Sequence, residues 1–244
     1  MRTQMLLRRW MKDMALFAVT ALVVSGCATS GRHVLLKEYG PSVPVLADQP
    51  LKGKTICLKT FQYASNLTSA EPKTKAAQPG QFIFVQFTSE QSKTWDKEFR
   101  ALKKTTTKAD WREIGNVRNG FGMVMSHVYA LNDPSLWLVE SLKMDLESQG
   151  AKVVDAAQSD SADISISGKI DFCRVDIYMK IWGDLVVDLE LQPKNGSPAH
   201  AVLHTDGGTV GWVGATSEFY KPLRECRQKL SWLLTQEISK ALKQ

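Results

Sequence analysis

The stretch from Ile164 to Leu191, ISISGKIDFCRVDIYMKIWGDLVVDLEL, decides the fold, because apolar and polar residues alternate along most of it. Alternation with a period of two is typical of β-strands that bury one face. The apolar set falls on even numbers as far as Phe172 and on odd numbers from Val175 onward. Since a slip of one residue turns side chains to the opposite face of a sheet, we expect a bulge or bend near residues 173–174. We also expect a turn at Trp182-Gly183.

The residues after this stretch predict a hairpin and a terminal helix. Asn195-Gly196 tolerates positive φ, so the chain should double back there into a strand over residues 199–212. The terminal helix should begin between residues 217 and 222, because the apolar residues that follow recur at helical spacing. One face of that helix is formed by Leu223, Cys226, Leu230, Leu233, Leu234 and Ile238.

The residues before this stretch predict one helix and two short strands. Asp133 and Pro134 suit the N-cap and first turn of a helix that Gly150 ends. Alternation predicts strands over residues 54–61 and 152–155. Together these elements predict an α+β fold, a mixed and mostly antiparallel sheet with two packed helices on one face.

Residues 64–108 look like an insertion into this pattern. They contain a polar loop with proline, a strand candidate over residues 81–88 and a short helix. The helix is indicated by Trp95, Phe99 and Leu102, which are spaced by four and three residues.

The first 26 residues have the layout of a secretory signal peptide. A basic segment through Lys12 precedes the apolar run Met14–Val24, and small residues follow that run. The run has 11 residues, whereas a transmembrane helix needs about 20. We therefore expect a cleaved signal and not a lasting membrane span.

The residues Val24-Ser25-Gly26-Cys27 resemble the lipobox of bacterial type II signal peptides. That resemblance implies cleavage between Gly26 and Cys27, a diacylglyceryl group on the Cys27 thiol and acylation of the new amine. Because Ala28 follows where Asp often marks inner-membrane retention, the expected location is the periplasmic leaflet of the outer membrane. The periplasmic side of the inner membrane is the alternative location, and an ordinary signal with a chance cysteine is the alternative interpretation.

Residues 27–50 predict a lipidated N-terminus followed by an extended, flexible tether. Three prolines and two glycines interrupt this segment, and it has no sustained periodicity. Residues 51–244 then form a single periplasmic α+β domain.

Several of these segments together resemble the YajG-like bacterial lipoproteins. They are the lipobox, the helix and strand over residues 137–154, the strand ADISISG over residues 162–168, the long hairpin and the terminal helix. The likeness is one of pattern and order and covers about residues 114–243. It implies a periplasmic lipoprotein of mixed α and β structure, and the wider pattern is similar to auxiliary lipoproteins of envelope transport and assembly. Residues 64–108 have no counterpart in it.

The charge of the chain gives no case for a nucleic-acid partner. The formal net charge is +6, but residues 1–26 hold four basic and one acidic side chain, which leaves +3 for the rest. A nucleic-acid interface needs a clustered basic face. One local basic stretch is explained as a solvated helix face. It consists of Lys97, Arg100, Lys103, Lys104 and Lys108.

The cysteines and histidines predict neither a metal site nor a specific disulfide. Lipid on Cys27 would leave Cys57, Cys173 and Cys226, which permit at most one disulfide and are equally well explained as buried thiols. His200 and His204 would lie about 13 Å apart along one strand, too far to share an ion. No metal, cofactor or catalytic residue is expected.

Arg118 is the residue that we would expect to meet an anionic ligand, if the chain binds one. It lies in Ile114–Gly122, IGNVRNGFG, whose glycines leave backbone N–H groups accessible. The spacing matches neither of the familiar phosphate-binding glycine motifs, so a glycine-rich turn beside the helix is the preferred interpretation.

Aromatic side chains around the hairpin are the other contact candidates. Tyr178, Trp182 and Trp212, together with Phe172, either fill the core between sheet and helices or line a groove for an acyl chain or a partner strand.

Two functions follow as expectations. The first is a lipid-anchored, non-enzymatic accessory of outer-membrane or envelope assembly, bound to the bilayer through Cys27 and to an unidentified envelope protein. The second is a lipoprotein that binds a small ligand such as a lipid or a cell-wall fragment. A pocket between the sheet and the helices of Leu138 and Leu230 would favour the second, and a filled core with an apolar surface patch the first. A hydrolase lacks a recognisable nucleophile, base or metal set.

Overall fold

The structure is a computed structural model that describes residues 31–46, 49–64, 75–77, 84–178, 180–209 and 216–243. The expected signal peptide, the lipobox through Cys27 and Trp212 lie outside these residues. The strands are β1 (Arg32–Val34), β2 (Thr55–Tyr63), β3 (Arg112–Arg118), β4 (Val124–Ala130), β5 (Lys152–Val154), β6 (Ile164–Tyr178), β7 (Lys180–Pro193) and β8 (Ala199–Thr209). The α-helices are α2 (Ser89–Thr105), α3 (Pro134–Ser148) and α4 (Tyr220–Ala241).

The long β6–β7 hairpin is the spine of a mixed sheet. On one edge of β6, β2 pairs in parallel with Ile164–Ile170 and β3 pairs in parallel with Val175–Ile177. β5 extends the sheet beyond β2, and β4 and then β1 extend it beyond β3. On the other side β7 and β8 add two antiparallel ladders, which are the longest of the sheet. The expected mixed sheet is therefore confirmed.

The change of face in β6 is produced by a bulge, as predicted, but two residues earlier. The register with β7 shifts between Ile170 and Phe172, so the extra residue is Asp171. The predicted turn at Trp182-Gly183 is wrong. Both residues lie within β7, because the strands reverse between Tyr178 and Lys180.

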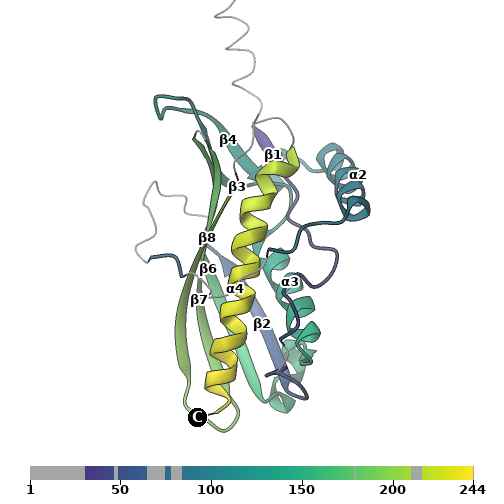
Figure 1. The fold of residues 1–244 in the computed structure, drawn as a ribbon, viewed down its shortest axis with the longest axis vertical. Helices are drawn as coiled ribbons and strands as arrows, with labels where there is room; N and C mark the ends of the chain where they lie inside the picture. The colour runs from purple at the N-terminus through teal and green to yellow at the C-terminus, as the bar shows by residue number, and fades with distance from the viewer. Residues whose placement is uncertain are drawn as a thin grey trace, which may run out of the picture.

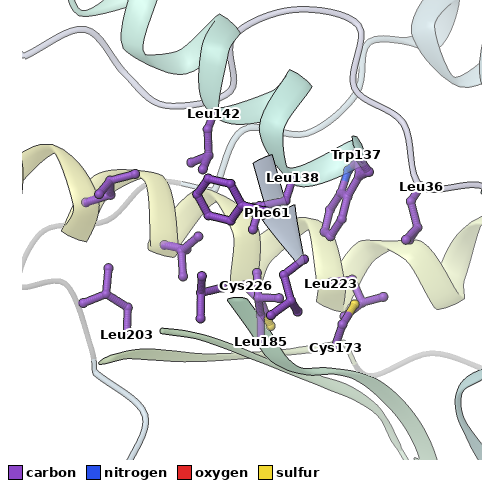
Figure 2. Packing of buried hydrophobic residues seen from close by; sticks show 14 of the residues in the cluster. Leu36, Phe61, Trp137, Leu138, Leu142, Cys173, Leu185, Leu203, Leu223 and Cys226 are labelled. Atoms are coloured by element: carbon purple, nitrogen blue, oxygen red, sulfur yellow. The ribbon is translucent and has the colours of Figure 1, made fainter. Parts of the chain in front are cut away.

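The core lies between the sheet and the helices α3 and α4, which cover one of its faces (Figure 1). Asp133 caps α3 by accepting from the Ser135 N–H, with Pro134 in the first turn. Figure 2 shows Leu138 and Leu142 of α3 and Leu223 of α4 in the same apolar layer as side chains of the sheet. The α+β class with two helices on one face is confirmed.

The tether predicted to end at residue 50 is corrected by the structure. β1 pairs in parallel with β4, and Val34, Leu35 and Leu36 are buried. The prolines that favoured a tether lie in an irregular segment, but Leu35, Leu36 and Val43 of that segment are buried. The folded domain therefore includes residues 31–46.

One more local prediction is wrong, one is confirmed in part and one is confirmed. Residues 84–88, the described part of the strand candidate, belong to no strand. The glycine-rich turn predicted within Ile114–Gly122 is confirmed for residues 119–122, which join β3 to β4, but Ile114–Arg118 lie in β3. Gly115 allows β3 to approach β6, because a Cβ there would lie 1.6 Å from the Val175 carbonyl oxygen. The helix indicated by Trp95 and Phe99 is α2, and both side chains are buried.

Candidate functional site

Three polar sites and one apolar site are candidates, and the first is a set of buried charges between the N-terminal segment and the helices. The Arg224 guanidinium of α4 donates from Nε to Glu38 Oε2 at 2.8 Å, and the Tyr220 hydroxyl donates to Glu38 Oε1 at 2.7 Å. One turn further along α4, Arg227 donates to Asp145 of α3. All five side chains are buried. This arrangement joins three segments that are distant in the sequence.

The charges in this network are matched and shielded from solvent. Burial raises the pKa of Tyr220, and the charge of Glu38 raises it further. For Arg227 burial lowers the pKa, but the charges of Glu38 and Asp145 outweigh that effect and the pKa is raised. Asp145 also accepts from the Ser42 N–H at 2.7 Å. A network so enclosed fixes the packing of the three segments, and its members Tyr220 and Arg224 also line the neighbouring pocket.

The second candidate is a small pocket beside this network. It has a volume of about 230 Å³ and lies between the first turns of α2 and α4. Its wall combines aromatic and charged side chains, including Trp95, Lys221 and Arg224. The Arg224 guanidinium already lies 4.0 Å from the Phe87 ring centroid and pairs with Glu38. The pocket is smaller than the roughly 300–1,000 Å³ usual for small-molecule sites.

The third candidate is a row of charges on the face of the sheet opposite the helices. The Arg174 guanidinium lies between the rings of Phe172 and Trp182, at 4.9 and 4.7 Å from their centroids. It also donates from Nη2 to Asp184 at 3.3 Å, and His204 Nε2 lies 3.3 Å from the other oxygen of that carboxylate. This pairing explains how Asp184 can be buried.

Three of the four predicted contact residues meet at one end of this row. Arg118 Nε donates to Asp176 Oδ2 at 3.0 Å, and Trp182 is the cross-strand partner of Asp176. Tyr178 lies next along β6 and donates from its hydroxyl to the Gly120 carbonyl at 3.3 Å. The charge of Arg118 is therefore committed to a buried carboxylate, which does not fit the prediction of a free anion site.

The aromatic residues of this region do not fill the core between sheet and helices. Phe172, Tyr178 and Trp182 alternate with the core-facing residues Cys173, Ile177 and Ile181 and therefore lie on the opposite face. The interpretation as core filling is wrong for these three. The fourth, Trp212, lies outside the described residues.

The apolar site is the turn that joins β3 to β4 together with the first two residues of β4, here called the hairpin tip and defined as Asn119–Met125. Phe121 is 90% exposed and Met123 is 59% exposed, and Val124 and Met125 are also exposed. The sequence predicted a glycine-rich turn in this stretch but not the exposed apolar residues that it carries. The turn is closed by the Gly122 N–H, which donates to the Asn119 carbonyl, and Gly122 has a positive φ.

Neither a metal centre nor a membrane-spanning helix is found in the part of the chain that the structure describes. Within those residues no group of three or more His, Cys, Asp or Glu side chains could hold an ion. His200 pairs with Asp188, and His204 with Asp184. None of the described helices is long and apolar enough to cross a bilayer. Cys57, Cys173 and Cys226 are buried free thiols.

Comparisons with known proteins find only distant structural likenesses. No family model and no curated protein matches the sequence. Among solved structures, a Xanthomonas campestris protein of the family DUF330 is 13% identical with a TM-score of 0.43, over 82% of this chain and 96% of that one. The PelC dodecamer of Paraburkholderia phytofirmans is 13% identical with a TM-score of 0.32, over 80% and 95%. The hypothetical protein CT253 of Chlamydia trachomatis is 9% identical with a TM-score of 0.31, over 78% and 97%. Likenesses at this level assign no function.

Proposed function

We propose that this protein is a lipid-anchored periplasmic lipoprotein that serves as a non-enzymatic accessory of the bacterial envelope, most simply of the outer membrane. The observation that carries this choice is the continuous cluster of buried apolar side chains between the sheet and the helices. Leu138, Leu142 and Leu230 are fully buried in it, and Figure 2 shows Leu138 and Leu142 among its side chains. Such a core combined with exposed apolar side chains at the hairpin tip favours an accessory over a carrier.

The anchoring itself rests on the sequence. The lipobox ends at Cys27, and two or three acyl chains at about 0.8 kcal/mol per buried CH₂ would hold the protein to a bilayer almost permanently. β1 begins at Arg32, so the domain would follow its anchor without a long tether. The resemblance of residues 114–243 to YajG-like lipoproteins agrees with this location.

The alternative is a lipoprotein that binds a small ligand, and the pocket between α2 and α4 is the observation that favours it. Its wall carries acids and bases side by side, with Lys221 paired to Glu218 at 2.6 Å. A ligand that fits about 230 Å³ would be a small polar molecule and not a lipid.

The experiment compares partners of the lipidated and unlipidated protein. Cells that express a C-terminally tagged chain are crosslinked, the envelope is dissolved in detergent, and co-purifying molecules are identified by mass spectrometry. Cys27→Ser is the matched control. We expect a stoichiometric envelope protein that is lost with Cys27→Ser. Recovery of the protein alone, with a small molecule bound in the α2–α4 pocket, would contradict the accessory function and support the alternative.

A further inference from the structure

We propose that the hairpin tip, Asn119–Met125, inserts into the interfacial region of the bilayer beside the lipid anchor. The proposal deepens the proposed function, because it rests on lipid attachment at Cys27. It gives the protein a second contact with the membrane and fixes which end of the domain faces it.

The first support is where the exposed apolar side chains lie. Among the described residues eight large apolar side chains are exposed, and five of them lie at this end of the sheet. Four belong to the hairpin tip, and the fifth is Tyr178, whose hydroxyl donates to the Gly120 carbonyl. A monomer that stays in water rarely gathers its exposed apolar residues in one place.

The charge around the tip suits an anionic lipid surface. Residues 114–126 and 177–183 contain no Asp or Glu. Arg118 at the base of the hairpin is partly exposed, and Lys180 across the neighbouring turn is exposed. Asp176 is buried and neutralises Arg118, so Lys180 supplies the remaining positive charge of these two basic residues. Apolar residues at the end with a basic residue behind them match the layering of a bilayer interface.

The backbone of the tip is prepared for a less polar environment. The Asn119 side chain accepts from the N–H groups of Phe121 and Met123, both at 3.0 Å. The Asn119 N–H donates to the Met123 carbonyl, and the Gly122 N–H donates to the Asn119 carbonyl. Gly122 has a φ of +82°, which closes the turn without the strain that a side chain would add. Paired backbone groups lower the cost of leaving water.

The reach of the anchor places the bilayer at this end. Five residue steps separate Cys27 from Arg32, so Cys27 lies at most roughly 17 Å from Arg32 at about 3.5 Å per residue. Arg32 pairs with Val128, and the four residues from there to Val124 carry the tip about 13 Å beyond it, before the turn is counted. The lipid on Cys27 and the hairpin tip can therefore extend to similar distances beyond Arg32 and its partner Val128. Figure 1 shows β1 and the β3–β4 hairpin at the same end of the molecule.

The experiment measures the depth of the tip in a membrane. The lipidated full chain carries Gly120→Cys, labelled with the environment-sensitive fluorophore NBD, in vesicles of phosphatidylethanolamine and phosphatidylglycerol. A Cβ at Gly120 meets nothing within 4 Å, and Cys57, Cys173 and Cys226 are buried, so the label is selective. We expect nitroxide lipids to quench the label. Aqueous iodide should quench it roughly tenfold more weakly than it quenches the same labelled protein in water without detergent or vesicles.

Two variants are the controls. Phe121→Asp with Met123→Asp should return the Gly120 label to water. A label on Ser197→Cys, in the exposed β7–β8 turn about 40 Å away along β7, should be equally accessible to iodide in both backgrounds. A Gly120 label that is shielded from iodide but not quenched by nitroxide lipids would mean that protein covers the tip, and it would overturn the proposal.

The outcomes separate insertion from anchoring. Protein that floats with the vesicles but keeps its Gly120 label in water overturns insertion and leaves the lipid anchor intact. If the fluorophore also reacts with Cys27, that thiol carries no lipid, and this result contradicts the proposed function. In that case Cys27→Ser protein with the Gly120 label is mixed with the same vesicles. Lipid quenching then supports insertion by the tip alone, and an aqueous label overturns it.

Discussion

At the scale of single residues, burial keeps the thiols of Cys173 and Cys226 protonated. Cys173 faces the core from β6, and Cys226 lies on the sheet side of α4, where its Sγ contacts the Gly183 carbonyl at 3.3 Å. Burial raises the pKa of both thiols, that of Cys173 from 9.0 to about 12. In the folded protein these side chains are neutral apolar groups, in agreement with the interpretation of buried thiols.

Because the pKa of Cys173 is raised in the folded protein, the free energy of unfolding should decrease at alkaline pH. Unfolded Cys173 loses its proton near pH 9, whereas the folded thiol keeps it up to about pH 12. Between these values the unfolded state binds fewer protons, so stability falls as pH rises, by about 1.4 kcal/mol per pH unit for this group. Below pH 9 the contribution is complete. Urea unfolding between about pH 9 and 11 should show a shallower decline for Cys173→Ala than for the wild type. Equal slopes for the two proteins would contradict this account.

At the scale of elements, one ion pair joins the two helices that cover the sheet. Arg227 of α4 is fully buried, and Asp145 of α3 supplies its direct partner. The pair also fixes the N-terminal segment, because the Ser42 N–H donates to the same carboxylate. Breaking one side of such a buried pair leaves a charge without compensation.

Asp145→Asn should therefore destabilise the protein by about 3–5 kcal/mol in urea unfolding. The matched control is Glu237→Gln, which breaks the solvent-exposed pair with Lys240 on the same helix α4 and should cost no more than about 1 kcal/mol. Similar losses for both variants would show that the buried pair does not hold α3 and α4 together.

Elements with strong local signals were predictable from the sequence. α3 has a cap and an apolar face, α4 has a long apolar face, and the β7–β8 hairpin has Asn195-Gly196. Each signal lies within about 20 residues, so no knowledge of distant contacts was needed.

The elements that were missed depend on distant partners. β1 is three residues long and exists because β4, almost 100 residues later, supplies its hydrogen bonds. β3 looked like a turn because Gly115 is required by the approach of Val175, which no local pattern reveals. For the candidate sites the same holds, since Arg118 and Asp176 lie 58 residues apart in the sequence. The exposure of Phe121 follows from the β3–β4 hairpin and could only be predicted once that hairpin was known.

At the scale of the whole molecule, the two ends of the sheet differ in character. β1 and the hairpin tip lie at one end, and the C-terminus and the β7–β8 turn lie at the other (Figure 1). The first end is apolar with a basic residue behind it, whereas the β7–β8 turn, Lys194–Ser197, is polar. If the first end faces the bilayer, the opposite end and the outer faces of α4 and β8 are left for an envelope partner.

The proposed function depends on lipid attached to Cys27, directly before the folded domain. The most direct measurement is the mass of the N-terminal peptide of protein purified from the envelope fraction. The account predicts a chain that begins at Cys27 and carries a diacylglyceryl group and an acyl group on its amine. An N-terminal peptide with an unmodified Cys27, or a chain cleaved elsewhere and recovered in the soluble fraction, would contradict it.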